Sequence, residues 1–424
     1  MTASAKVPMS ATLAADAEFE RRRRAGERVL FLATGEIGLP VLPELAERLA
    51  RAAGRTAYGP VAGSTELREA AAGYWGRRGL DTDPADVVCG PGSKPLLFAL
   101  LLAVGGDVVV PVPSWVSYAA HARLAGLRAI GVRTRPGEGG VPDPDELRAR
   151  VLAARAGGRD PRAVIVTLPD NPTGTIASPE TVRDLAEAAQ ELNLVIISDE
   201  IYGDLVFAPG DRAISPAVFA PDRTVVTTGL TKSLAVGGWR LGVARLPTGP
   251  DGRSLRDRLA AVASQIWSSA AAPVQAAAAY ALAEPPEVTA RVAASRRLHE
   301  RVVRSVAVKL LAAGAEVASV RATCYLYPDF EPQRDELSHR HGVHGSDELA
   351  ALLSTRYGVA LLPGTAFGEP PRSLRLRVAT SRLYGESDAE QSAALAAPDP
   401  LALPWIQASV ERVAEVFNDL SRRP

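Results

Sequence analysis

The chain has 424 residues, 47% of them hydrophobic and 23% charged, so it should bury a sizeable core and divide into more than one domain. Its 48 basic and 48 acidic residues cancel, which argues against nonspecific binding to nucleic acid or to a membrane surface. Two cysteines, Cys89 and Cys324, are too few for a disulfide framework or a cysteine-rich zinc site.

No segment reads as a membrane span or an export signal. The longest apolar run, Leu96–Val104, is far shorter than the roughly 20 residues that cross a bilayer. The N-terminus lacks the apolar stretch of a signal peptide. We therefore expect a cytoplasmic protein.

Residues 1–45 are predicted to form an N-terminal arm and part of a small domain. The stretch from Glu18 to Glu27 carries mixed charge and is predicted to be a helix with a solvated face. A short strand at Val29–Ala33 leads into a loop rich in glycine and proline, Gly35–Pro43.

Residues 46–290 alternate between helical and strand-like segments. The helix near Ser64–Arg78 has Ser64 as its expected N-cap. The strands are apolar throughout, which is typical of a mostly parallel sheet covered by helices on both faces. The predicted strands are Val87–Cys89, Val108–Val112, Ala163–Leu168, Leu194–Ser198 and Thr224–Thr228, and the helices between them include Lys94–Ala103 and Pro179–Leu192. We therefore predict an α/β fold with a large cofactor-binding domain.

Residues 291–424 are predicted to form a smaller α+β domain, which the N-terminal arm completes. A long helix, Pro286–Ala313, leads into it, and a helix at Ser409–Leu420 ends it. The strands expected here are Tyr325–Tyr327, Val359–Leu362 and Leu374–Val378. The segment Gly385–Pro404 is rich in Ala, Pro and Asp and is predicted to be an inserted loop.

Polar residues follow several of the apolar strands. Only four lysines occur among the 48 basic residues, and one of them, Lys232, comes just after Thr224–Thr228. Asp199 and Tyr202 follow Leu194–Ser198, and Asn171 follows Ala163–Leu168. Because ligands bind beyond the carboxyl ends of parallel strands, these side chains are candidates for one site.

Two further features at this edge suit an anion. Gly90-Pro91-Gly92-Ser93-Lys94 opens a helix after a strand, and its free backbone amides can bind a phosphate. Arg240 lies in a glycine-rich segment eight residues after Lys232. An amine, a carboxylate, a tyrosine, an asparagine and an anion site together suit a phosphorylated aldehyde cofactor with a basic ring nitrogen.

The motifs also carry a family resemblance over most of the chain, from about Ser10 to Ser381. Each motif alone is weak, but all of them in this order are specific. They are Tyr58-Gly59-Pro60 with Gly63 and Glu66-Leu67-Arg68; Gly92-Ser93-Lys94; Pro113-Ser114-Trp115-Val116-Ser117-Tyr118; Asn171-Pro172-Thr173-Gly174; Asp199-Glu200-Ile201-Tyr202; Thr231-Lys232; Gly238-Trp239-Arg240; Pro363-Gly364-Thr365-Ala366-Phe367-Gly368; and Arg375 before Ala379-Thr380-Ser381. The chain resembles the class I/II aminotransferases, which are fold-type I pyridoxal-phosphate enzymes, and is similar to bacterial aspartate aminotransferases.

The resemblance implies a role for each matching residue. Lys232 would form the Schiff base with pyridoxal 5'-phosphate and later act as the base, and Asp199 would bind the pyridine nitrogen. The remaining implied cofactor contacts are Tyr202 and Asn171 to the phenolic oxygen, Trp115 to the ring, Ser93, Lys94, Thr231 and Arg240 around the phosphate, and Tyr58 to the phosphate of the neighbouring subunit. The implied substrate contacts are Arg375 to the α-carboxylate, with Gly35, Trp115 and Asn171 beside it, and Lys94 to a distal carboxylate.

Other interpretations of single residues stay open at this point. Asp199 alone could be a helix N-cap, and Trp115 could simply fill a loop. Arg377 competes with Arg375 on the same strand, although the spacing to Ala379-Thr380-Ser381 favours Arg375. His339, His341 and His344 resemble a metal cluster but lack carboxylates at ligand spacing, so no metal is predicted.

The resemblance implies an aminotransferase that moves the amino group of an L-amino acid to a 2-oxo acid by a ping-pong Schiff-base mechanism. A homodimer with composite active sites is implied, and neither a nucleic acid nor a membrane is expected as a partner. One alternative is another pyridoxal-phosphate reaction on the same scaffold, by a lyase, decarboxylase, cyclase or oxidase. A second is a cofactor-binding regulator fused to a DNA-binding domain, for which the roughly 28 residues before the first strand are too few. Departures from the family pattern at Ile37-Gly38 and in Gly385–Pro404 leave the substrate open.

Overall fold

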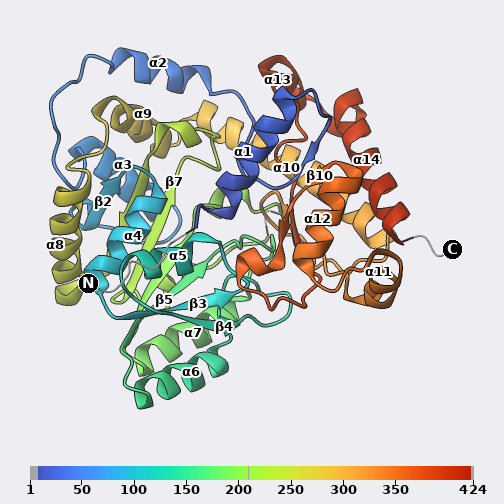
Figure 1. The fold of residues 1–424 in the computed structure, drawn as a ribbon. Helices are drawn as coiled ribbons and strands as arrows, with labels where there is room; N and C mark the ends of the chain where they lie inside the picture. Colours follow the sequence, from blue (N-terminus) through green and yellow to red (C-terminus); the bar gives the residue numbers. More distant parts are fainter. Residues whose placement is uncertain (1–7, 209, 422–424) are drawn as a thin grey trace.

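A computed structural model describes residues 8–208 and 210–421. Its centre is a seven-stranded sheet, which Figure 1 shows between layers of helices. The strand order is β2-β8-β7-β6-β5-β3-β4, and only β8 runs antiparallel to its neighbours. The strands are β2 Val87–Gly90, β3 Asp107–Val112, β4 Ala129–Arg133, β5 Pro161–Thr167, β6 Val195–Asp199, β7 Thr224–Gly229 and β8 Gly242–Arg245. The predicted mostly parallel α/β sheet is confirmed.

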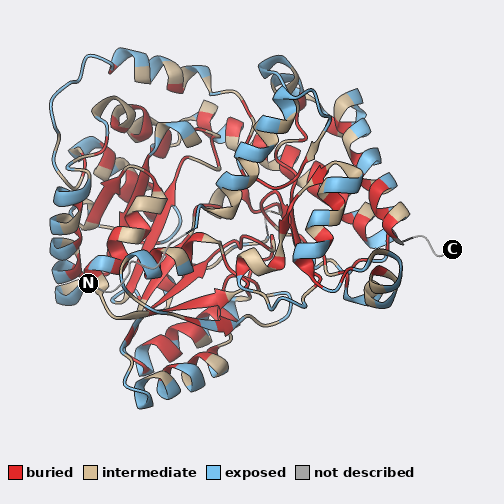
Figure 2. Cartoon of the chain, viewed as in Figure 1, coloured by how far each residue is buried: buried red, intermediate tan, exposed pale blue. Residues whose placement is uncertain are grey.

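Helices cover both faces of this sheet, and the strands are buried between them (Figures 1 and 2). Val108 and Ile165 pack in one apolar cluster with residues of α4, whereas Val109 and Val164 pack in another with residues of α7. This burial on both sides explains why the strands are continuously apolar. The helices of this part are α2 Pro43–Arg51, α3 Thr65–Gly76, α4 Ser93–Val104, α5 Ser117–Leu124, α6 Pro144–Ala156, α7 Pro179–Glu191, α8 Gly249–Ile266 and α9 Ala272–Leu282.

A second unit follows the long helix α10, Pro286–Ala312. It holds the antiparallel sheet β11-β12-β9, and the N-terminal strand β1 pairs in parallel with β10. The helix α1, Ala11–Arg24, packs beside β11 (Figure 1). The remaining elements are β1 Leu30–Phe31, β9 Tyr325–Leu326, β10 Val359–Ala360, β11 Leu362–Pro363, β12 Leu376–Ala379, α11 Arg334–His341, α12 Ser346–Tyr357, α13 Asp388–Ala396 and α14 Pro404–Ser421.

Short 3-10 helices connect several of these elements. They are η1 Pro84–Asp86, η2 Gly203–Leu205, η3 Pro216–Val218, η4 Gly237–Trp239, η5 Glu331–Gln333, η6 Gly364–Phe367 and η7 Pro400–Ala402. The pairing of β1 with β10 brings the N-terminal segment to the C-terminal unit, although the domain boundaries at 45 and 290 stay a prediction.

The segment 385–404 is not a plain loop, so this prediction was wrong. It contains α13, whose start is fixed by a capping box in which Ser387 and Glu390 exchange side-chain and backbone hydrogen bonds. The final helix α14 begins at Pro404, earlier than predicted, because proline is favourable in the first turn of a helix. The predicted N-cap of α3 is confirmed, since the Ser64 hydroxyl accepts from the Leu67 amide at 3.2 Å.

Candidate active site

Four neighbouring strands each lead to one of the predicted site residues. Lys232 follows β7, Asp199 ends β6, Asn171 follows β5 and Trp115 follows β3. These strands run parallel to one another, so their carboxyl ends lie along one edge of the sheet. The order of the strands therefore brings together residues that lie up to 117 positions apart, from Trp115 to Lys232.

The Lys232 amine lies against the N-terminal loop. Its Nζ donates to the Gly35 carbonyl at 2.6 Å and lies 5.8 Å from the centre of the Tyr202 ring. Burial lowers the pKa of this amine to about 8. A Cβ on Gly35 would lie 1.6 Å from the Tyr325 hydroxyl, so this position needs glycine. The result is a lysine that can lose its proton near neutral pH, as a nucleophile or a base requires.

Asp199 is a buried carboxylate, 4% exposed, at the same edge. Its Oδ2 accepts from the Tyr118 hydroxyl at 2.8 Å, and the Thr227 hydroxyl donates to Oδ1 at 3.5 Å. Burial raises the pKa of Asp199 to about 6, partly offset by the hydrogen bond from Tyr118. No helix begins at Asp199, so the N-cap alternative does not fit, and a cationic ring nitrogen would stabilise the charged form.

A chain of hydrogen bonds runs from Tyr202 to Arg377. The Tyr202 and Tyr325 hydroxyls are 2.8 Å apart, and Asn171 Nδ2 donates to Tyr202 Oη at 3.5 Å. Arg377 Nη1 donates to Asn171 Oδ1 at 3.3 Å, and Nη2 donates to the carbonyl of Ala33. Sequence reasoning did not single out Tyr325, which lies in the short, fully buried strand β9.

Arg377 lies within this cluster as a buried cation. It is 1% exposed, and its guanidinium lies 5.0 Å from the ring centres of both Tyr325 and Phe367. Its Nε–H is buried without a partner. A guanidinium that is buried, held by rings and still has a free donor is suited to bind a carboxylate.

Arg375, the predicted α-carboxylate residue, does not join this cluster. Its Nε pairs with Asp329 at 2.8 Å and its Nη1 with Glu369 at 2.9 Å, so both sides of the guanidinium already meet carboxylates. It lines a cavity of about 810 Å³ whose lining includes neither Lys232 nor Asp199. The structure therefore brings the competitor Arg377, and not Arg375, into the cluster, while the α-carboxylate role predicted for Arg375 stays a prediction.

The segment predicted to cradle a phosphate lies at the start of α4. Gly92 has a φ of 103°, and the helix has no side-chain cap, so its first amides are free. A Cβ on Gly92 would lie 2.5 Å from the Arg240 guanidinium, and a Cβ on Gly242 would lie 2.5 Å from the Ser93 nitrogen. Glycine at both positions lets the guanidinium and the helix N-terminus converge, which is the arrangement that binds phosphate.

Lys94 and Trp115 form the side of the site next to this cradle. Lys94 Nζ lies 5.1 Å from the centre of the Trp115 ring, and Trp115 packs edge-on against Tyr118 at 5.3 Å. Burial and the nearby Arg240 lower the pKa of Lys94. Burial also lowers the pKa of His121, which packs against the same ring, to about 4, so this histidine is neutral.

Two predicted residues lie at the margin. Thr231 directly precedes Lys232, and its methyl group would lie 3.3 Å from a Cβ on Gly237, at the start of the short helix that leads to Arg240. Tyr58 is 91% exposed, and no contact joins it to the cluster. An exposed tyrosine of this kind is expected if its partner lies on another subunit.

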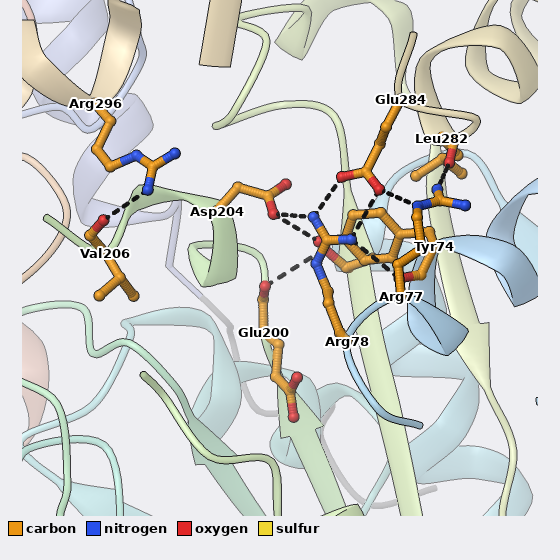
Figure 3. Close-up of polar contacts among 10 residues, drawn as sticks. Tyr74, Arg77, Arg78, Glu200, Asp204, Val206, Leu282, Glu284 and Arg296 are labelled. Atoms are coloured by element: carbon orange, nitrogen blue, oxygen red, sulfur yellow. Dashed lines mark hydrogen bonds and ion pairs between the residues drawn. The ribbon is translucent and has the colours of Figure 1, made fainter. Parts of the chain in front are cut away.

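An ion-pair network lies next to the segment that carries Asp199 and Tyr202 (Figure 3). Arg78 pairs with Asp204 at 2.6 Å and Glu284 at 2.5 Å, and its guanidinium lies 3.4 Å from the centre of the Tyr74 ring. Asp204 follows Tyr202 by two residues, so the network fixes the segment that carries Asp199 and Tyr202. Charge spacing along the sequence gave no signal for it, because its members come from three distant segments.

These residues fit a phosphorylated pyridine aldehyde. The free amides and Arg240 match a phosphate, Asp199 matches a protonated ring nitrogen, and Lys232 matches the aldehyde. Within the described residues, no group of three or more His, Cys, Asp or Glu side chains could hold a metal ion. In the same part of the chain, no helix is both long and apolar enough to cross a membrane.

Comparison with known proteins gives matches over nearly the whole chain. The family model "Aminotransferase class I and II" matches residues 27–383. The chain is 34% identical over 381 residues to the aspartate/prephenate aminotransferase of Thermus thermophilus, covering 88% of this chain and 92% of that protein. The solved aspartate aminotransferase of T. thermophilus with maleate has a TM-score of 0.80 at 30% identity, covering 96% and 97% of the two chains. The N-succinyldiaminopimelate aminotransferase of Mycobacterium tuberculosis has a TM-score of 0.76 at 28% identity, covering 90% and 95%.

Proposed function

Because the chain belongs to the class I and II aminotransferases, we propose that it is a pyridoxal-phosphate-dependent enzyme in which Lys232 binds the cofactor covalently. The predicted family and the predicted class of enzyme are confirmed, and the chain is a transaminase that transfers amino groups. The observation that carries the cofactor proposal is the partly buried Lys232 amine, with its lowered pKa, beside Asp199 and the phosphate cradle.

Pyridoxal 5'-phosphate, when bound, supplies an electron sink that makes the substrate α-proton acidic. The amides at the start of α4, with Arg240, would hold its phosphate. Asp199 would accept from the ring N–H, and Tyr118 keeps the carboxylate oriented through its 2.8 Å hydrogen bond. Tyr202 and Asn171 would bind the phenolic oxygen, and Trp115 would pack against the ring.

Arg377 receives the substrate α-carboxylate in this proposal. Its burial supports this role, because a carboxylate would neutralise a guanidinium that now has a free Nε–H. Asn171 bridges Arg377 to Tyr202, so the substrate carboxylate and the reacting end of the cofactor are positioned by one hydrogen-bond chain. The Gly35 carbonyl and the loop that carries it lie against the Lys232 amine in this site.

Lys232 moves the proton. With a pKa of about 8, a useful fraction of the amine is neutral at physiological pH and can accept the proton from the substrate Cα. The Gly35 carbonyl, 2.6 Å from Nζ, orients the amine when it is free. Asp199 is buried and Lys232 is partly buried, which limits the access of water to this transfer.

A homodimer with composite sites completes the proposal. The exposure of Tyr58 supports it, since a side chain that is 91% exposed in one subunit is free to contact a neighbouring subunit. The predicted cytoplasmic location stays a prediction.

The substrate class is the finest part of the proposal. Relatives are named for aspartate, for prephenate and for N-succinyldiaminopimelate, so enzymes of this fold act on several different substrates. Lys94, next to Trp115 and the cradle, supports a donor with a second carboxylate. We therefore propose dicarboxylic amino donors, with Lys94 as the residue that meets the distal carboxylate.

Borohydride reduction of the protein loaded with pyridoxal phosphate tests the assignment of the cofactor. The expected result is one modified peptide that contains Lys232. Labelling at Lys94 or Lys309 would contradict it. Lys232→Ala should lose the label and the turnover, whereas Lys309→Ala, on the last turn of α10, should keep both.

A further inference from the structure

Three arginines are more than nine-tenths buried in the described part of the chain: Arg245 at 3%, Arg291 at 8% and Arg377 at 1% exposed. Arg377 faces the proposed substrate carboxylate. Arg245 lies in the field of Asp86, Glu200 and Asp81, which partly offset its burial. Arg291 has no such compensation, because burial alone lowers its pKa and no charged group acts in the opposite direction.

The guanidinium of Arg291 makes a single hydrogen bond. Its Nη2 donates to the Pro40 carbonyl at 2.5 Å, and its Nε–H is buried without a partner. Among residues 8–208 and 210–421, no carboxylate lies close enough to the Arg291 guanidinium to form an ion pair, for which the limit is 4.0 Å. A carbonyl oxygen supplies only part of the negative charge that a buried cation needs.

Further unpaired polar groups lie along the same face of α10. Ser295 follows Arg291 by one helical turn, and His299 follows Ser295 by another, so the three side chains share a face. Ser295 is 1% exposed and its hydroxyl has no partner. His299 is fully buried, with Nδ1 bonded to the Tyr384 hydroxyl and Nε2 unpaired. Two free donors, Arg291 Nε–H and Ser295 Oγ–H, therefore lie one turn apart beside an uncompensated charge.

We propose that Arg291 and Ser295 bind a small inorganic anion of the chloride class beneath the loop Gly35–Pro43. Buried charges in proteins are paired, and a halide needs only the space of one small ion. The donors match it, since a chloride accepts hydrogen bonds and carries a full negative charge. Water satisfies the donors but leaves the charge, which is why an anion is the better occupant.

The anion also affects the active site through the loop. Arg291 holds Pro40, and the same loop holds Gly35, whose carbonyl meets Lys232. When the anion neutralises its charge, Arg291 can stay buried and keep its hydrogen bond to the Pro40 carbonyl, so the loop stays packed on α10. Without the anion, solvation favours a guanidinium that turns toward water, and the loop then loses this hydrogen bond to α10.

The direct experiment soaks crystals of the holoenzyme in sodium bromide and collects data at the bromine edge. The expected result is an anomalous peak within hydrogen-bond distance of Arg291 Nε and Ser295 Oγ. Arg291→Met fills the site with an apolar chain of similar reach, should fold because buried charges tolerate such replacement, and should lose the peak. Absence of the peak in the wild type, or an ordered water there instead, would overturn the proposal.

A second experiment works in solution and does not depend on turnover. Replacing gluconate with 100 mM chloride should raise the thermal unfolding midpoint of the wild type by about 2 °C through preferential binding to the folded state. Arg291→Met should show no chloride effect. Arg296→Met is the matched control, because Arg296 lies on a different side of α10 from Arg291 and donates to the Val206 carbonyl at 3.5 Å (Figure 3). An equal chloride effect in wild type and Arg291→Met would contradict the proposal.

A third measurement separates a free anion from a substrate carboxylate. Hydrogen exchange of the loop amides, at residues 36–42, should slow in chloride without any substrate. If the loop responds only to a dicarboxylic substrate, and bromide gives no peak, the anion is part of the substrate and the free-anion site is wrong. Because neither bromide binding nor exchange requires amino transfer, these results are independent of the proposed enzymatic function.

Discussion

Replacing Arg377 by leucine should remove the α-carboxylate site, whereas the same change at Arg375 should not. A guanidinium and a carboxylate share two charged hydrogen bonds, each worth about 1.5–3 kcal/mol, so the loss is about 3–6 kcal/mol. That corresponds to a fall in kcat/KM of about 10²–10⁴-fold. Arg375 is 43% exposed and is paired with Asp329 and Glu369. Screening leaves those pairs worth about 1 kcal/mol of stability, and the change in kcat/KM should stay within a few-fold.

The assay compares both variants as holoenzymes, with an amino acid and with the corresponding amine that lacks the carboxylate. Arg377→Leu should lose activity toward the amino acid but keep the weak reaction of the amine. Arg377→Lys should recover part of the activity. The lysine ammonium keeps the positive charge, but it lacks the two parallel N–H donors with which a guanidinium binds a carboxylate. Near-normal kcat/KM in Arg377→Leu, together with a large loss in Arg375→Leu, would refute the assignment and restore the choice made from spacing.

Four further results are expected. Asp199→Asn should keep the cofactor but lower kcat by about 10²–10³-fold, because a neutral amide does not stabilise a protonated ring nitrogen; near-normal activity, measured by steady-state kinetics, would contradict this. Lys94→Ala should raise the KM for aspartate or glutamate at a cost of about 1.5–3 kcal/mol and spare alanine, and equal losses for all donors would show that Lys94 does not read a second carboxylate. Mixing Lys232→Ala with an impaired Tyr58→Phe variant should restore some activity as subunits exchange, and a monomer active at all dilutions would defeat the composite site. For His299, burial lowers the pKa to about 3 from an ordinary 6.5, so the unfolded chain takes up a proton first as pH falls below 6.5, and stability is lost toward pH 3. Between pH 7 and pH 5, His299→Phe should therefore lose about 2 kcal/mol less unfolding free energy than the wild type in urea titrations, and parallel losses would refute the assigned pKa.

The large domain could be predicted because its strands are buried on both faces. Continuous apolar runs such as 163–168 leave few alternatives to a covered parallel strand, and the structure confirms them as β5 and its neighbours. β8 was not predicted, because Gly242–Arg245 is short and follows a glycine-rich segment that reads as a loop. The helix α13 was missed because the Pro and Asp residues of this segment are typical of loops, although the alanines within α13 favour a helix and a capping box of one serine and one glutamate fixes its start.

Some of the site residues could be predicted from the sequence and others could not. Lys232, Asp199 and Asn171 could be predicted, because each follows a strand directly and the order of a parallel sheet brings strand ends together. Spacing favoured Arg375 over Arg377, but in the structure Arg375 lies just before β12 and is partly exposed, whereas Arg377 lies within β12 and is buried in the cluster. Their difference arises from Asp329 and Glu369, which neutralise one arginine, and from Asn171 and Ala33, which hold the other. Such partners come from distant segments, and spacing within one strand contains no information about them.

Transfer of a labelled nitrogen tests the central claim most directly. The holoenzyme is incubated with a ¹⁵N-labelled amino donor and an unlabelled 2-oxo acid, and the products are followed by mass spectrometry. The account predicts that ¹⁵N appears in the amino acid formed from the 2-oxo acid, that each half-reaction proceeds without the second substrate, and that Lys232→Ala stops the transfer. Release of ¹⁵N as ammonia or loss of carbon dioxide from the donor, with no label in the acceptor, would contradict it.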